Sequence, residues 1–203
     1  MAVLEGGLRD LAASIARSAI LPLLYLVQAV EGRVTPEGMR EVAAILGLTT
    51  AEVEGVASFY TMLRLRPTGR HVVSVCTNLA CALRGAAEVY EAAHRAFGMR
   101  PGQEVSDDGL VTLHEEECLG ACDAAPVVQI DFANHDRVTP ERMAELAEAL
   151  RRGEVPPPSR GTAPRDFRHA SWILAGLPGE PPPGAGAPAG AEDGRAAAEG
   201  VAP

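Results

Sequence analysis

Apolar side chains recur every three or four positions through the first part of the chain, which is the spacing of one face of an α-helix. Pro22 falls inside this pattern and Gly32 ends it, so a helix bent near Pro22 is predicted. Two more short helices follow, one with Thr35 as its N-cap and one that begins near Thr50. Short helices cannot each bury an apolar face alone, so residues 1–68 are predicted to form a helical bundle. The apolar positions of the first helix are Leu8, Leu11, Ile15, Ala19, Leu23, Leu26 and Val30.

The pattern changes after Pro67 and Gly69, where a β-branched run from His71 to Val75 ends at Cys76 and predicts a strand. The order of strands and helices beyond this point is that of a small sheet covered by helices. We therefore predict an α/β (α+β) fold whose second domain spans residues 69–153. The further elements are a helix over 83–98, strands around 110–114 and 127–132, a short strand near Arg137, and a helix from Thr139 to about residue 152.

Composition changes after Gly153 to a stretch rich in Pro, Gly and Ala. Such a sequence cannot bury enough apolar surface to offset roughly 1–2 kcal/mol of backbone entropy per ordered residue. Residues 154–203 are therefore predicted to be a disordered tail or a tail draped over a partner. The exception is FRHASWIL at 167–174, whose large apolar side chains could dock on the rest of the protein or collapse only transiently.

The net charge is −9 and the isoelectric point is about 5.1. No stretch concentrates positive charge, which argues against a nucleic-acid partner. The apolar run at 19–30 is too short to cross a bilayer and contains Pro22 and Gln28. Without a recognisable cleavage signal, a cytoplasmic protein is expected.

The four cysteines form two close pairs, and each pair follows a predicted strand. Cys76 and Cys81 have four residues between them, and Cys118 and Cys122 have three. Paired cysteines in a reducing compartment indicate metal binding or catalysis more often than disulfides. If both strands end at one edge of the sheet, four thiolates meet there, which is the ligand number of a 2Fe-2S cluster.

Three other interpretations of these cysteines remain open. Structural zinc sites usually take pairs separated by two residues, and neither pair has this spacing. A thioredoxin-type thiol pair has the same two-residue spacing at the start of a helix. Four inert core cysteines would not need to pair in loops beside Gly and Pro. The five histidines share no motif, so none is assigned as a ligand.

Acidic residues flank the second cysteine pair at Glu115, Glu116, Glu117 and Asp123. A 2Fe-2S cluster with four thiolates carries a charge of about −2 and reaches about −3 on reduction. Nearby carboxylates disfavour that added charge, so a centre of low reduction potential is predicted.

Two long strings, VEGVASFYTMLRLRPTGRHVVSVCTNLACALRG at 53–85 and ECLGACDAAPVVQI at 117–130, resemble a known family. This family is the thioredoxin-like 2Fe-2S ferredoxin that forms the E subunit of NADH-quinone oxidoreductase, the respiratory complex I, and the resemblance covers about residues 14–152. It implies that Cys76, Cys81, Cys118 and Cys122 hold one 2Fe-2S cluster, with each pair on one iron. The implied fold is a helical bundle followed by a thioredoxin-like ferredoxin domain.

The resemblance also implies a function and partners. The chain would be an electron carrier without catalytic side chains of its own, exchanging single electrons with FMN in a flavin subunit that binds NADH. That subunit and other peripheral-arm subunits would be its partners, placing it on the cytoplasmic side of the inner membrane only through the complex. The equivalent subunit of a soluble NAD-dependent formate dehydrogenase or bidirectional hydrogenase is an alternative, and a zinc-stabilised interaction module is another. The segment DFANHDRVTPE at 131–141 departs from the family pattern, and the family does not explain 167–174.

Overall fold

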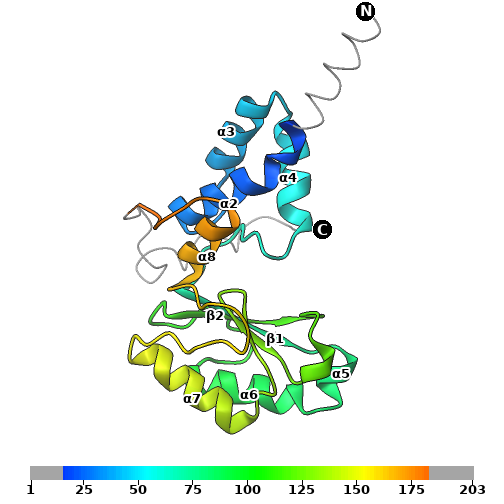
Figure 1. Ribbon diagram of the computed structural model, residues 1–203, viewed down its shortest axis with the longest axis vertical. Coiled ribbons are helices and arrows are strands. Elements are labelled where there is room, and N and C mark those ends of the chain that lie inside the picture. Colours follow the sequence, from blue (N-terminus) through cyan, green and yellow to red (C-terminus); the bar gives the residue numbers. More distant parts are fainter. Residues whose placement is uncertain (1–15, 183–203) are drawn as a thin grey trace, which may run out of the picture.

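The computed structural model describes residues 16–182, which form a helical bundle stacked on a mixed four-stranded sheet (Figure 1). The predicted α+β fold class is confirmed. The first half of the predicted N-terminal helix and the tail from 183 onward lie outside the described residues. None of the helices in the described part is both long and apolar enough to cross a bilayer.

The bundle contains the three predicted helices, α2 (Ile20–Glu31), α3 (Pro36–Leu46) and α4 (Thr50–Phe59). The predicted N-terminal helix is interrupted at Ala19, near the predicted bend. The cause is Pro22, which has no N–H to donate to the backbone carbonyl four residues earlier. Side-chain caps fix the starts of the other two helices. The Thr35 hydroxyl accepts the Gly38 N–H at 3.0 Å, and Thr49 forms a reciprocal capping box with Glu52.

The sheet has the strand order β2-β1-β3-β4. Strands β1 (His71–Cys76) and β2 (Val111–Glu116) are parallel, while β3 (Val128–Ile130) and β4 (Ala133–His135) continue the sheet antiparallel. The predicted strand at 127–132 is shorter than expected because Asp131 and Phe132 adopt positive φ and turn the chain tightly into β4.

Helices α6 (Ala86–Phe97) and α7 (Pro140–Arg151) cover one face of the sheet (Figure 1). The helix predicted over 83–98 is present as α6, and a short helix that was not predicted, α5 (Leu79–Ala82), precedes it. The core between sheet and helices consists of aliphatic side chains with two methionines and one phenylalanine. Its fully buried members include Val73, Val75, Val89, Val111, Leu113, Val128, Met143, Leu146 and Leu150.

The segment 167–174, whose apolar side chains suggested docking, forms helix α8 (Phe167–Leu174) and packs on α2. Its Arg168 donates hydrogen bonds of 2.7 Å to the carbonyls of Ala29 and Val30 at the end of α2. Phe167 is buried, and its ring lies 5.5 Å from that of Phe132 in the β3–β4 turn. This helix therefore joins the bundle to the sheet, as Figure 1 shows.

Candidate metal centre

Both cysteine loops begin at the same edge of the sheet. Cys76 is the last residue of β1 and lies opposite Glu116, the last residue of β2. The Thr77 N–H donates to the Glu116 carbonyl at 2.9 Å just beyond the strands. The common edge expected from the sequence is therefore present, and it delivers the two loops side by side.

The first pair, Cys76 and Cys81, belongs to a small cluster of buried apolar residues. Both residues are buried, among Ala86, Ala121 and Val127. Burial, followed by a hydrogen bond with the Cys76 thiol, raises the pKa of Cys81 to about 11, and the Val127 backbone N–H opposes this rise. The thiol is therefore protonated at neutral pH, and a metal that binds it must displace the proton.

The second pair, Cys118 and Cys122, lies in an exposed loop. Gly120 adopts φ 70° between them, a backbone conformation that suits glycine and turns the loop back on itself. The neighbouring Cys118 thiol raises the pKa of Cys122. Raised pKa values are the opposite of what an activated nucleophilic thiol requires, which counts against a thiol oxidoreductase.

The two pairs approach each other across the loops. The Cys76 Sγ lies 3.8 Å from the Glu117 carbonyl oxygen, directly before Cys118. Cys122 is close enough to both Cys76 and Cys81 for their charges to interact. All four cysteines are free.

Two thiol pairs are a donor set that a cluster with two irons can use. Within residues 16–182, no three His, Cys, Asp or Glu side chains converge on one metal position. A structural zinc needs four ligands around one point. In a 2Fe-2S cluster each iron takes only two protein sulfurs, so two separate thiol pairs suit its chemistry.

The second cysteine loop is surrounded by acidic residues close to it in the sequence and by one arginine that is distant in the sequence. Glu115, Glu117 and Asp123 are exposed acids there. Arg160, which lies beyond α7, reaches the loop and places its Nη2 3.8 Å from the Asp123 Oδ1. Sequence reasoning missed Arg160 because no local pattern links it to the cysteines.

The histidines among the described residues have other contacts. His71 Nδ1 lies 2.6 Å from the buried Asp131 carboxylate, and His114 Nε2 lies 2.5 Å from the Arg64 guanidinium. Neither contact involves a cysteine.

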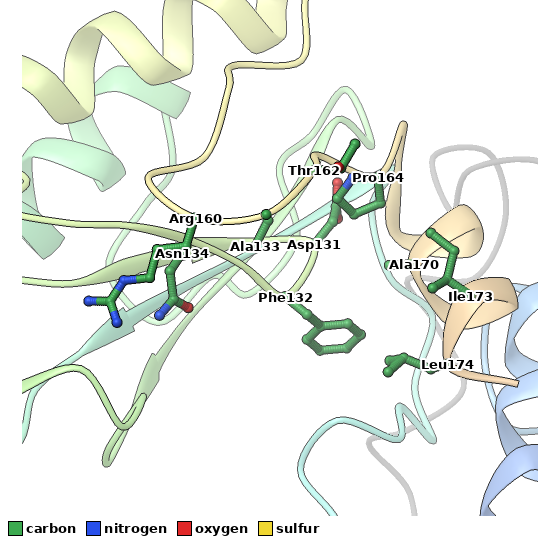
Figure 2. A pocket seen from close by; sticks show the side chains of 11 residues that line it. Asp131, Phe132, Ala133, Asn134, Arg160, Thr162, Pro164, Ala170, Ile173 and Leu174 are labelled. Atoms are coloured by element: carbon green, nitrogen blue, oxygen red, sulfur yellow. The ribbon is translucent and has the colours of Figure 1, made fainter. Parts of the chain in front are cut away.

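A pocket of about 280 Å³ lies between the β3–β4 turn, the segment around residue 162 and helix α8. Figure 2 shows Phe132 and Leu174 on its apolar side and Asn134 and Arg160 at its polar end. None of the four cysteines lines it. The pocket is therefore separate from the cysteine site.

Comparison with known proteins finds a matching family and several relatives. Residues 12–151 match the thioredoxin-like 2Fe-2S ferredoxin family. The chain is 48% identical over 166 residues to the E subunit of NADH-quinone oxidoreductase from Mycobacterium tuberculosis (strain ATCC 25618 / H37Rv), a match that covers 82% of this chain and 66% of the relative. It is 42% identical over 139 residues to NADH-quinone oxidoreductase subunit 2 of Thermus thermophilus, covering 68% of this chain and 76% of the relative.

Among solved structures, the fold resembles part of an NAD+-reducing NiFe hydrogenase in the H2-reduced state, with a TM-score of 0.53 and 24% identity. That match covers 66% of this chain and 22% of the hydrogenase chain, and it bears on the fold alone. The sequence matches carry the assignment. The chain belongs to the thioredoxin-like 2Fe-2S ferredoxin family.

Proposed function

We propose that this chain is the electron-transfer subunit of an NADH-quinone oxidoreductase and carries one 2Fe-2S cluster on Cys76, Cys81, Cys118 and Cys122. The observation that supports it most directly is the delivery of two thiol pairs to one edge of the sheet by the parallel strands β1 and β2. The relatives named as subunits of that oxidoreductase support the same assignment.

The protein's own part in this function is to hold the cluster and to shield it from water. A bound 2Fe-2S cluster supplies one-electron exchange, so no side chain needs to act as an acid or a base. The buried apolar residues around Cys76 and Cys81 keep water from the inner pair, while the second pair lies at the surface, where a partner can approach. Backbone N–H groups such as that of Val127 favour the negative charge of the sulfurs.

The NADH and FMN would belong to a partner subunit. The sequence of this chain contains no Gly-rich nucleotide loop, which agrees with that division of labour. Attachment to the cytoplasmic side of the membrane would be indirect, through the other subunits. Three parts would make up the chain, a helical bundle at 1–68, a cluster domain at 69–153 and a C-terminal segment at 154–203 whose helix α8 packs on the bundle.

Anaerobic purification followed by iron, sulfide and zinc analysis tests the cluster. We expect about two irons and two sulfides per chain, a brown protein, and an EPR signal that appears after one-electron reduction. A colourless protein with stoichiometric zinc would instead establish the interaction-module alternative.

Single Cys→Ser variants test the ligands. Cys118→Ser and Cys122→Ser change exposed side chains, so the fold should survive while the visible spectrum is weakened or lost. Ala80→Ser is the matched control because it places a hydroxyl in the first cysteine loop without removing a thiol. Full iron and sulfide content in either cysteine variant would remove that residue from the ligand set.

The proposed partnership is tested by mixing this chain with a flavin subunit. The chain should form a complex with the flavin subunit of an NADH-quinone oxidoreductase, and NADH should then reduce the cluster. NADH alone should leave the isolated chain oxidised. Reduction of the isolated chain by NADH would contradict the assignment of nucleotide binding to a partner.

A further inference from the structure

The segment between α7 and α8, residues 154–166, is a strap that runs back along the edge strand β4. The Ser159 N–H donates to the Asn134 carbonyl at 2.7 Å, and the Asp136 N–H donates to the Ser159 hydroxyl at 2.8 Å. These two bonds fix the strap to β4 on either side of His135. The position of the next residue, Arg160, is therefore set by the sheet.

The Arg160 guanidinium is held between two carboxylates. Its Nε and Nη2 donate to the Asp136 Oδ2 at 3.1 and 3.0 Å, and the Asp136 side chain is only 14% exposed. From this anchor, Nη2 lies 3.8 Å from the Asp123 Oδ1. Figure 2 shows Arg160 beside Asn134, away from the apolar side of the pocket.

Asp123 directly follows Cys122, so Arg160 brings a positive charge to the second cysteine loop. The chain from 101 to 136 contains no Lys or Arg, although it carries Glu115, Glu117 and Asp123 around the loop. A further anchor connects β4 to the loop, because the Arg137 N–H donates to the Ala124 carbonyl at 2.8 Å. The loop, β4 and the strap are therefore held as one unit.

We propose that Arg160 is a positioning residue of the cluster site, which neutralises Asp123 and would thereby make it easier for a cluster held by the neighbouring cysteines to accept an electron. The inference rests on the proposed function, because it needs a cluster on these cysteines. An exposed ion pair of this length adds little to folding stability. The Arg160 charge still affects the reduction potential. Reduction adds negative charge to the cluster, and a nearby positive charge stabilises the reduced form more than the oxidised form.

The test is an EPR-monitored redox titration of the full-length chain with its cluster, comparing Arg160→Gln with the parent. The midpoint potential of Arg160→Gln should be lower, because Asp123 and Asp136 lose their shared cation. Arg160→Lys keeps the charge and should bring the potential back toward that of the parent. The downward shift should shrink as salt is raised, since Arg160 is half-exposed.

Arg165→Gln is the matched control. Arg165 lies in the same strap, its side chain is 51% exposed like that of Arg160, and it pairs at 2.8 Å with Glu180. This variant makes the same charge change and should leave the potential where it was. Equal potentials for Arg160→Gln and the parent, or an equal shift in Arg165→Gln, would overturn the proposal.

The result also separates this inference from the proposed function. A parent chain that binds no iron refutes the function itself, whereas a normal cluster with an unmoved potential refutes only the role of Arg160. If Arg160→Gln binds less iron than the parent, the potential of the cluster that remains bound decides, because iron loss alone would also follow from leaving Asp136 without its partner. A lowered potential in that fraction supports the proposal, and an unchanged one overturns it.

Discussion

Gln28 of α2 and Ser171 of α8 are joined by a buried hydrogen bond of 3.0 Å, although 143 positions separate them in the sequence. The Gln28 side chain has no exposed surface, and its amide also donates to the Met62 carbonyl at 3.1 Å and accepts the Arg64 N–H at 2.7 Å. One side chain thus ties together α2, the loop after α4, and α8. The C-terminal helix is therefore part of the core of the bundle.

Replacing Ser171 by Ala should destabilise the protein. The change leaves one buried N–H of Gln28 without its partner, which costs about 1–3 kcal/mol. The free energy of unfolding, measured by urea denaturation, should fall by that amount.

Ser58→Ala is the control for this change. Ser58 also donates to a carbonyl of its own helix, that of Gly55 at 3.3 Å, as Ser171 does to Phe167 at 2.9 Å, but Ser58 is exposed and has no partner comparable to Gln28 among the contacts of the described residues. Loss of the Ser58 hydroxyl should change the free energy of unfolding little. If the two variants lose equal stability, the bond to Gln28 contributes nothing.

Phe167→Ala tests the packing of α8 rather than its polar contact. Phe167 is 1% exposed and lies against Phe132, so its truncation should lower the free energy of unfolding by about 3–5 kcal/mol. Phe59→Ala also removes a phenyl ring, but Phe59 is 77% exposed, so the free energy of unfolding should change little. A small effect at Phe167 would mean that α8 does not stay on the bundle in solution.

Much of the fold could be predicted because it depends on local rules. Helices α3 and α7 begin at Thr-Pro caps and α3 ends at a glycine, and these signals occupy only a few neighbouring residues. A β-branched run before Cys76 predicts β1, and the parallel pairing of β1 with β2 brings the cysteine loops together as expected.

The surface on which α8 packs and the contact made by Arg160 could not be predicted with the same rules. The apolar side chains of 167–174 suggested docking, but nothing in the sequence indicates α2 as the helix they contact. The reach of Arg160 to Asp123 depends on how the strap crosses β4. That path is set by tertiary hydrogen bonds, which leave no periodic signal in the sequence.

Glu117→Gln should raise the midpoint potential of the bound cluster. Glu117 is exposed and adjoins Cys118. A carboxylate about 8 Å from an added electron opposes it by roughly 2 kcal/mol at an effective dielectric constant near 20, or about 90 mV, before solvent screening reduces the value. An upward shift of roughly tens of millivolts is therefore expected in a redox titration.

Glu145→Gln is the control for that shift, because Glu145 is an exposed acid on α7 that pairs with Arg142 at 2.7 Å. Its removal should not move the potential. The parent protein should itself titrate well below zero millivolts. A potential well above zero would contradict the idea that the acidic loop makes the centre hard to reduce.

Acid should destabilise the protein through His114, which links the sheet to the bundle. Burial, followed by the neighbouring Arg64 cation, lowers the pKa of His114 to about 3. Its Nε2 also lies 3.0 Å from the Ser74 hydroxyl and 3.3 Å from the Glu116 carboxylate. In the unfolded chain a histidine binds its proton near pH 6.5. Below that pH only the unfolded state binds this proton, so the free energy of unfolding should fall by up to about 1.4 kcal/mol per pH unit until the pH approaches 3.

In urea unfolding between pH 7.5 and 5, the parent should therefore lose stability more steeply than His114→Gln, with a constant difference between them above pH 7. Parallel curves over the whole range would show that His114 is not held neutral by its burial beside Arg64.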